Sequence, residues 1–146
     1  MPAGPLSPLE ISALLIERDA ESAKLIQVVL EPWGVTVVIV ASIREAEIMI
    51  ATVRPDIILC DIVAPHGDGL EFIRRLRTSR DIKLKNIPAI AITAAYEDVD
   101  ARAARAAGFD VFIRKPIDPD QLPHTVALLI GQAEAGGDRG KDTGNS

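Results

Sequence analysis

The chain has 146 residues, a length that suits one domain and lets it bury a core without disulfides or structural metals. Its formal net charge of −5 argues against a general nucleic-acid-binding protein. No apolar run approaches the roughly 20 residues of a membrane-spanning helix. The single cysteine, Cys60, excludes an internal disulfide and fits a reducing compartment. We therefore expect a cytoplasmic protein that binds neither nucleic acid nor membrane.

The two ends of the chain differ in composition from its middle. Residues 1–10 contain three prolines, which disfavour a helix or a central strand. Residues 132–146 are rich in glycine and charged side chains and offer almost nothing to bury. We predict that these two segments are disordered and that residues 11–131 form one folded domain.

Five short apolar runs alternate with amphipathic segments along this domain. The runs cover residues 13–16, 35–40, 57–60, 89–92 and 111–113. Each run shows little polar alternation, which is typical of strands buried on both faces of a parallel sheet. Right-handed crossovers between such strands place helices on both faces. The pattern predicts an α/β fold with a doubly wound, five-stranded parallel sheet.

The segments between the runs predict five helices. They begin near residues 19, 42, 69, 98 and 120. Ser42 can cap the second helix, and Glu45 three residues later completes a capping box. Pro123 is tolerated only in the first turn of a helix, which favours Asp120 over Asp118 as the cap of the last one.

Polar side chains follow four of the five apolar runs. Glu17 follows the first run, Asp61 the third, Thr93 the fourth and Lys115 the fifth. In open parallel sheets, ligands bind at the carboxyl ends of the strands, so these side chains should converge if the strand order is the flavodoxin-like 2-1-3-4-5. A carboxylate nucleophile beside a hydroxyl and a lysine suits phosphoryl transfer.

Residues 12 to 130 resemble the receiver domains of bacterial response regulators. The phosphorylation-site segment of that family resembles PDIILCDIVAPHGDGLEFI, which implies that Asp61 is the phospho-acceptor. Its fourth strand resembles IPAIAITA, with Thr93 as the switch hydroxyl. Its fifth strand resembles GFDVFIRKP, with Phe112 at the switch aromatic position and Lys115 as the lysine that pairs with the phosphate.

The resemblance also implies a magnesium ion. Its ligands would be Glu17, Asp61 and the backbone carbonyl of Val63. The family usually has two adjacent acids after the first strand, and the second acid is a direct ligand, whereas this chain has Arg18 there. A register shifted by one residue would supply Asp19 instead, but the apolar run ends directly before Glu17, which favours the first register. We expect Mg²⁺ binding to be weak or absent.

These observations predict a signalling module rather than an enzyme. A histidine kinase or a histidine phosphotransfer protein would transfer a phosphoryl group to Asp61, and a downstream protein would bind the switched surface. The first alternative is a pseudo-receiver, a protein-interaction module that is never phosphorylated, which Arg18 favours. The second is an aspartyl-nucleophile phosphatase, which would need a second acid where Val63 stands. The cognate kinase, the output and the oligomeric state, including a homodimer, stay open.

Other residues have simpler interpretations. Phe112 could belong to the core, and Arg18 could point into solvent. Cys60 is expected to pack inside the third strand. Six basic residues before the fourth strand predict a solvated face, with a partner-docking patch as the alternative. They are Arg74, Arg75, Arg77, Arg80, Lys83 and Lys85.

Overall fold

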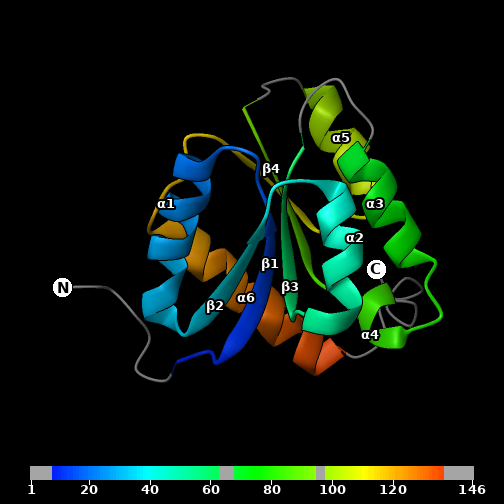
Figure 1. Ribbon diagram of the computed structural model, residues 1–146, viewed down its shortest axis with the longest axis horizontal. Helices are drawn as coiled ribbons and strands as arrows, with labels where there is room; N and C mark the ends of the chain where they lie inside the picture. The colour runs from blue at the N-terminus through cyan, green and yellow to red at the C-terminus, as the bar shows by residue number, and fades with distance from the viewer. Residues whose placement is uncertain (1–7, 63–67, 95–97, 137–146) are drawn as a thin grey trace.

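A five-stranded parallel sheet forms the centre of the computed structural model, which describes residues 8–62, 68–94 and 98–136 (Figure 1). The strands are β1 (Ile11–Ile16), β2 (Val35–Val40), β3 (Ile57–Asp61), β4 (Ala89–Thr93) and β5 (Val111–Arg114). Their order is β2-β1-β3-β4-β5, and every neighbouring pair is parallel. The predicted fold class and strand order are therefore confirmed.

The described residues form six α-helices, one more than the sequence predicts. They are α1 (Ala20–Leu30), α2 (Ile43–Val53), α3 (Asp68–Arg77), α4 (Ile82–Lys85), α5 (Asp98–Ala107) and α6 (Gln121–Gly136). A 3-10 turn, η1 (Glu31–Trp33), follows α1. The additional helix, α4, is a single turn capped by the side chain of Asp81, too short to produce a helical period in the sequence. None of the helices in these described ranges is long and apolar enough to span a bilayer.

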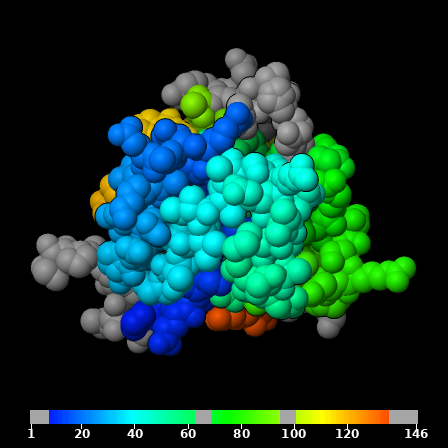
Figure 2. Space-filling view, viewed as in Figure 1, coloured from blue at the N-terminus to red at the C-terminus, as the bar shows by residue number. Residues whose placement is uncertain are grey.

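The helices lie in two layers, one on each face of the sheet (Figure 1). Helices α1 and α6 cover one face, where Ile26 and Val126 pack against side chains such as Leu15 and Leu59. Helices α2, α3 and α5 cover the other face. The space-filling view shows α1, β2 and α2 on the near side, with one end of α6 emerging below (Figure 2). Burial of these aliphatic side chains is the main stabilising contribution to the fold.

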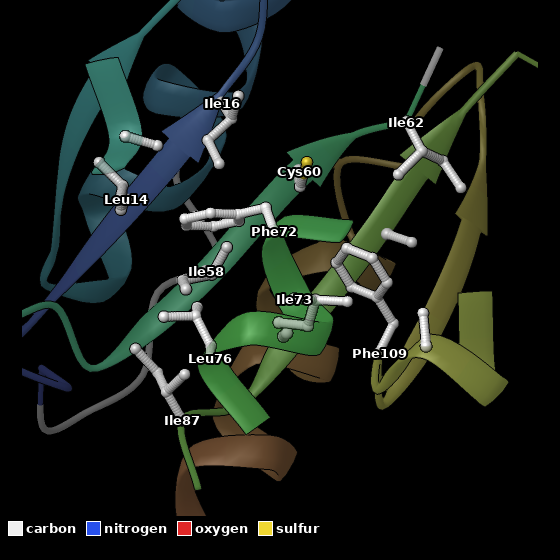
Figure 3. Close-up of a cluster of buried hydrophobic side chains, with 14 of the residues drawn as sticks. Leu14, Ile16, Ile58, Cys60, Ile62, Phe72, Ile73, Leu76, Ile87 and Phe109 are labelled. Atoms are coloured by element: carbon white, nitrogen blue, oxygen red, sulfur yellow. The ribbon is translucent and has the colours of Figure 1, made fainter. Parts of the chain in front are cut away.

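The core on the second face is made mainly of aliphatic residues from β1, β3, β4 and α3 (Figure 3). Phe72 and Ile73 of α3 lie over Ile58 and Cys60 of β3 in this cluster. From residues 101–107 of helix α5, Ala104 and Ala107 belong to this cluster. Each of these alanines buries little area.

Local caps fix where the first two helices begin. The side chain of Asp19 accepts a hydrogen bond from the N–H of Ser22 at 3.0 Å and so caps α1. The hydroxyl of Ser42 accepts one from the N–H of Glu45 at 3.1 Å and caps α2. The Glu45 carboxylate reaches back to the N–H of Ala41, one residue before the one that a capping box requires.

The beginning of α6 agrees with the position of Pro123. The helix starts at Gln121, directly after Asp120, so Pro123 lies in the first turn, as predicted. The side chain that accepts hydrogen bonds from the backbone at this end of the helix is nevertheless that of Asp118, not that of Asp120. Its Oδ1 accepts from the N–H groups of Asp120 and Gln121 at 2.8 and 3.3 Å.

The described structure continues on both sides of residues 11–131. The N–H of Leu9 donates to the carbonyl of Trp33 at 2.8 Å, which joins the segment before β1 to η1. Helix α6 continues to Gly136, five residues beyond the predicted end at 131. The reason is local, because residues 132–135 read Gln-Ala-Glu-Ala, and all four are good helix formers. Residues 1–7 and 137–146 lie outside the described part of the chain.

Arg77 departs from the predicted solvated basic face. Its side chain is only 12% exposed. The guanidinium donates to the carbonyl of Gly108 at 2.7 and 2.9 Å and to those of Lys85 and Ile87 at 3.0 and 2.6 Å. It also meets the carboxylate of Asp110 at 3.3 Å. Arg77 therefore ties the end of α3 to the segments that precede β4 and β5.

Candidate functional site

Three charged side chains meet at the carboxyl ends of β1, β3 and β5. Glu17 directly follows β1, Asp61 is the last residue of β3, and Lys115 directly follows β5. The Nζ atom of Lys115 lies 2.8 Å from Oδ2 of Asp61 and 3.0 Å from Oε1 of Glu17. The predicted convergence of these residues is therefore observed, and the ammonium group bridges the two carboxylates.

The sheet itself positions these residues. The N–H of Glu17 donates to the carbonyl of Val40 at the end of β2, at 2.9 Å. The N–H of Lys115 donates to the carbonyl of Thr93 at the end of β4, at 2.8 Å. Each charged residue thus continues the hydrogen-bond ladder of a neighbouring strand by one step, which limits the freedom of its backbone.

Burial dominates the electrostatics of Glu17. Its carboxylate is only 2% exposed, and this burial raises the pKa of Glu17 above its ordinary value. Hydrogen bonds from the N–H of Asp19 and from Lys115 oppose the rise, and the nearby carboxylate of Asp61 adds to it. A second negative charge beside Asp61 is therefore costly unless a cation is present.

Lys115 supplies that cation. Burial alone would lower the pKa of Lys115, but hydrogen bonds to Asp61 and Glu17 and attraction to both carboxylates outweigh burial and raise it. The ammonium group therefore stays charged at neutral pH. Asp61 itself keeps 15% of its side chain exposed to solvent.

The remaining predicted switch residues lie on β4 and β5. Thr93 is the last residue of β4 and is buried, next in the sheet to the strand that ends at Asp61. Phe112 is half-buried in β5 and packs against the core cluster on the α3 side of the sheet. This packing agrees with the core interpretation of Phe112, and its switch role stays a prediction. Val63 lies outside the described residues.

The segment between β1 and α1 contains Glu17, Arg18 and Asp19. Strand β1 ends at Ile16, so Glu17 is the acid at the strand end. Asp19 caps α1, with its Oδ2 accepting from the N–H and the hydroxyl of Ser22 at 3.0 and 2.6 Å. Its own N–H donates to Oε2 of Glu17 at 3.1 Å, a positioning contact that the sequence did not indicate. Arg18, between the two acids, has an exposed side chain.

The described side chains at the site offer a magnesium ion a poor set of ligands. Mg²⁺ requires near-octahedral oxygen ligands and is reluctant to lose its water. Both carboxylates in the site already contact the ammonium of Lys115. Across 8–62, 68–94 and 98–136, no three His, Cys, Asp or Glu side chains are grouped so that they could hold a metal.

Cys60 adjoins Asp61 in sequence but belongs to the core, as predicted. Its thiol is fully buried, and burial raises the pKa of Cys60 to about 12. The thiol is therefore protonated at neutral pH and is not a nucleophile of the site.

Comparisons with known proteins agree with this geometry. The family model for the response regulator receiver domain matches residues 13–127. The chain is 31% identical over 122 residues to the polar-differentiation response regulator DivK of Brucella anthropi, covering 84% of this chain and 98% of DivK. It is 30% identical over 134 residues to the response regulator Rre1 of Synechocystis, where it covers 91% of this chain but only 57% of Rre1.

A solved structure shows the same fold. The signal receiver domain of a signal transduction histidine kinase from Syntrophus aciditrophicus superposes with a TM-score of 0.75 at 29% sequence identity, over 85% of this chain and 92% of that domain. The residues that the family model matches, 13–127, include β2 to β5 in full, β1 from Ala13 onward, and the three charged residues at the carboxyl edge of the sheet. The chain belongs to the response regulator receiver domain family, whose members are signalling modules of two-component systems.

Proposed function

We propose that this chain receives a phosphoryl group on Asp61 from a histidine kinase or a histidine phosphotransfer protein. The observation that carries the proposal is the contact of 2.8 Å between Asp61 and the Lys115 ammonium, at the carboxyl edge of the sheet. A carboxylate oxygen of Asp61 would attack phosphorus, and the bond from phosphorus to the donor would break. The Lys115 ammonium would then contact the phosphoryl oxygens, which carry the negative charge after the transfer.

The output of such a step would be a change in a protein-binding surface around α5 and β5. Thr93 ends β4, and the buried side chains in the described part of α5, Ala104 and Ala107, each offer little apolar contact to hold this helix in one position. A small movement at Thr93 could therefore displace α5, and Phe112 could turn inward. The kinase and the downstream protein are not identified by these residues, and a homodimer is one form the output could take.

A labelling experiment tests the assignment of Asp61. The protein is treated with acetyl phosphate, with and without Mg²⁺, and weighed by intact mass spectrometry. The expected result is the gain of one phosphoryl group that base removes, and its loss in Asp61→Asn with the fold retained. Asp56→Asn, at the opposite end of β3, is the matched control and should be labelled like wild type. Undiminished labelling of Asp61→Asn would place the acceptor elsewhere.

The alternative is a pseudo-receiver that binds partners without phosphorylation. Arg18 favours it, because a positive charge stands where the family resemblance implies a metal-binding acid. The intact pair of Asp61 and Lys115 opposes it. If no condition or donor labels Asp61 in a protein shown to be folded, the pseudo-receiver becomes the better description.

A further inference from the structure

The carboxyl edge of the sheet has little surplus negative charge to attract a divalent cation. Glu17, Asp61 and nearby Asp19 carry three negative charges, and Lys115 and Arg18 carry two positive ones, which leaves a net charge of −1. Both carboxylates already contact the Lys115 ammonium, at 3.0 and 2.8 Å. A magnesium ion would have to compete with this ammonium for both carboxylates, and Arg18 supplies no carboxylate at the position where the family resemblance implies a metal ligand.

Asp19 does not replace the missing carboxylate. One of its oxygens accepts two hydrogen bonds from Ser22, at 2.6 and 3.0 Å, and this contact begins α1. Turning Asp19 toward the site would remove the cap of α1 and destabilise the first turn of that helix. The metal expected from the family therefore disagrees with the residues that this chain places at the site.

Hydrogen bonds fix the backbone on both sides of Arg18, whereas its side chain is exposed to solvent. The backbone before it is tied to β2 by the hydrogen bond from Glu17 to Val40, and the backbone after it by the bond from Asp19 to Glu17. The side chain is exposed, and no hydrogen bond or ion pair joins its guanidinium to the described residues. The guanidinium is a planar fork that binds two phosphate oxygens at once.

We propose that Arg18 takes the place of the divalent cation, so that Asp61 accepts a phosphoryl group without metal. This inference rests on the proposed function. An oxygen of Asp61 forms a bond to the phosphorus of an acyl phosphate, and the bond from phosphorus to the acyl oxygen breaks. The carboxylate leaving group departs with that electron pair, and no proton or electron donor is needed. Arg18 and Lys115 balance the two negative charges of the transferred group.

Labelling by acetyl phosphate in EDTA and in millimolar Mg²⁺ separates the two kinds of site. Wild type should be labelled at the same rate in both solutions. Arg18→Gln should lose labelling in EDTA by about 100-fold, the usual effect of removing one donor to a developing oxyanion. Arg18→Asp restores a carboxylate, so its labelling should become at least about tenfold faster with Mg²⁺ than in EDTA.

A magnesium titration followed by NMR provides a readout that does not depend on phosphorylation. The amide signals of Glu17, Asp61 and their neighbours should hardly move in wild type and should titrate in Arg18→Asp. Equal Mg²⁺ affinity in the two proteins, or labelling of wild type only with Mg²⁺, would overturn the role of Arg18 and leave Asp61 as acceptor. If no variant is labelled in any solution, the proposed function fails and this inference fails with it.

Discussion

The ammonium of Lys115 lies 2.8 Å from the carboxylate of Asp61, although 54 residues separate them in the chain. The contact exists because β3 and β5 lie on either side of β4 and end at the same edge of the sheet. The same ammonium contacts Glu17 at 3.0 Å, so one lysine bridges the carboxylates at the ends of two different strands. The charge state of this triad governs how the site responds to substitution and to pH.

Replacing Lys115 by alanine should leave the fold intact but remove the response to phosphorylation. The charge-assisted contact of Lys115 with the phosphoryl oxygens would be worth roughly 1.5 to 3 kcal/mol where water is excluded. Without this contact, phosphorylation would stabilise the switched conformation less. The measurement is the change in the NMR spectrum of α5 and β5 on treatment with acetyl phosphate. A variant that is labelled and changes its spectrum like wild type would show that Lys115 is not part of the switch.

Replacing Glu17 by glutamine should change the pH dependence of stability. Because burial raises the pKa of Glu17 in the folded state, its contribution to stability is fully present below the ordinary value of 4.5 and is lost as pH rises through the raised pKa. The free energy of unfolding of Glu17→Gln should therefore increase relative to wild type as pH rises from 4 to 7.

Denaturant titrations at several pH values measure this difference. Glu134→Gln, an exposed position near the end of α6, controls for the loss of one negative charge and should not reproduce the trend. A constant difference between Glu17→Gln and wild type across this pH range would mean that Glu17 has the same pKa in both states.

Cys60 should resist alkylation in the native protein. Its thiol is fully buried, and burial raises the pKa of Cys60 to about 12, so almost no thiolate is present at pH 8. Iodoacetamide should react at least about a hundredfold more slowly with the native protein than with the unfolded chain, since reaction requires β3 to open. Mass spectrometry follows the reaction, and similar rates in both states would show that the centre of the sheet opens easily.

The strands and the charged site were predictable because both depend on short stretches of sequence. A buried parallel strand is a continuous apolar run, and the first polar residue after it lies at the carboxyl edge of the sheet. Glu17, Asp61 and Lys115 were found in this way, and their contacts agree with the prediction. The single turn of α4 was missed because four residues cannot display a helical period.

The role of Arg77 was missed for a different reason. Its partners are carbonyl groups of residues 85, 87 and 108, and no local pattern indicates which backbone atoms will lack a donor after folding. One signal was available in the helix. Arg77 follows Ile73 by four residues and therefore lies on the buried face of α3, where a charged side chain needs partners.

Replacing Arg77 by methionine should destabilise the protein strongly. The substitution keeps an unbranched side chain but leaves the carbonyls of Gly108 and Ile87 and the carboxylate of Asp110 without this donor, and partial burial makes their loss costly. We expect a loss of about 3 kcal/mol in the free energy of unfolding. Thermal unfolding should shift down by roughly 10 °C in a domain of this size.

Two further variants distinguish the network of Arg77 from a general effect of charge. Arg74→Met removes a guanidinium that is 51% exposed on the same helix, so its stability should stay within about 0.5 kcal/mol of wild type. Arg77→Lys keeps the charge but lacks the planar fork and cannot reach all the carbonyls at once. Its free energy of unfolding should therefore lie between those of Arg77→Met and wild type. Addition of a Cβ at Gly108 should be costly as well, because it would lie 2.7 Å from Cγ of Arg77 at a backbone φ of +128°. Equal stability of Arg77→Met and Arg74→Met would show that other groups or water satisfy these carbonyls, and that the end of α3 does not hold the segments before β4 and β5 in place.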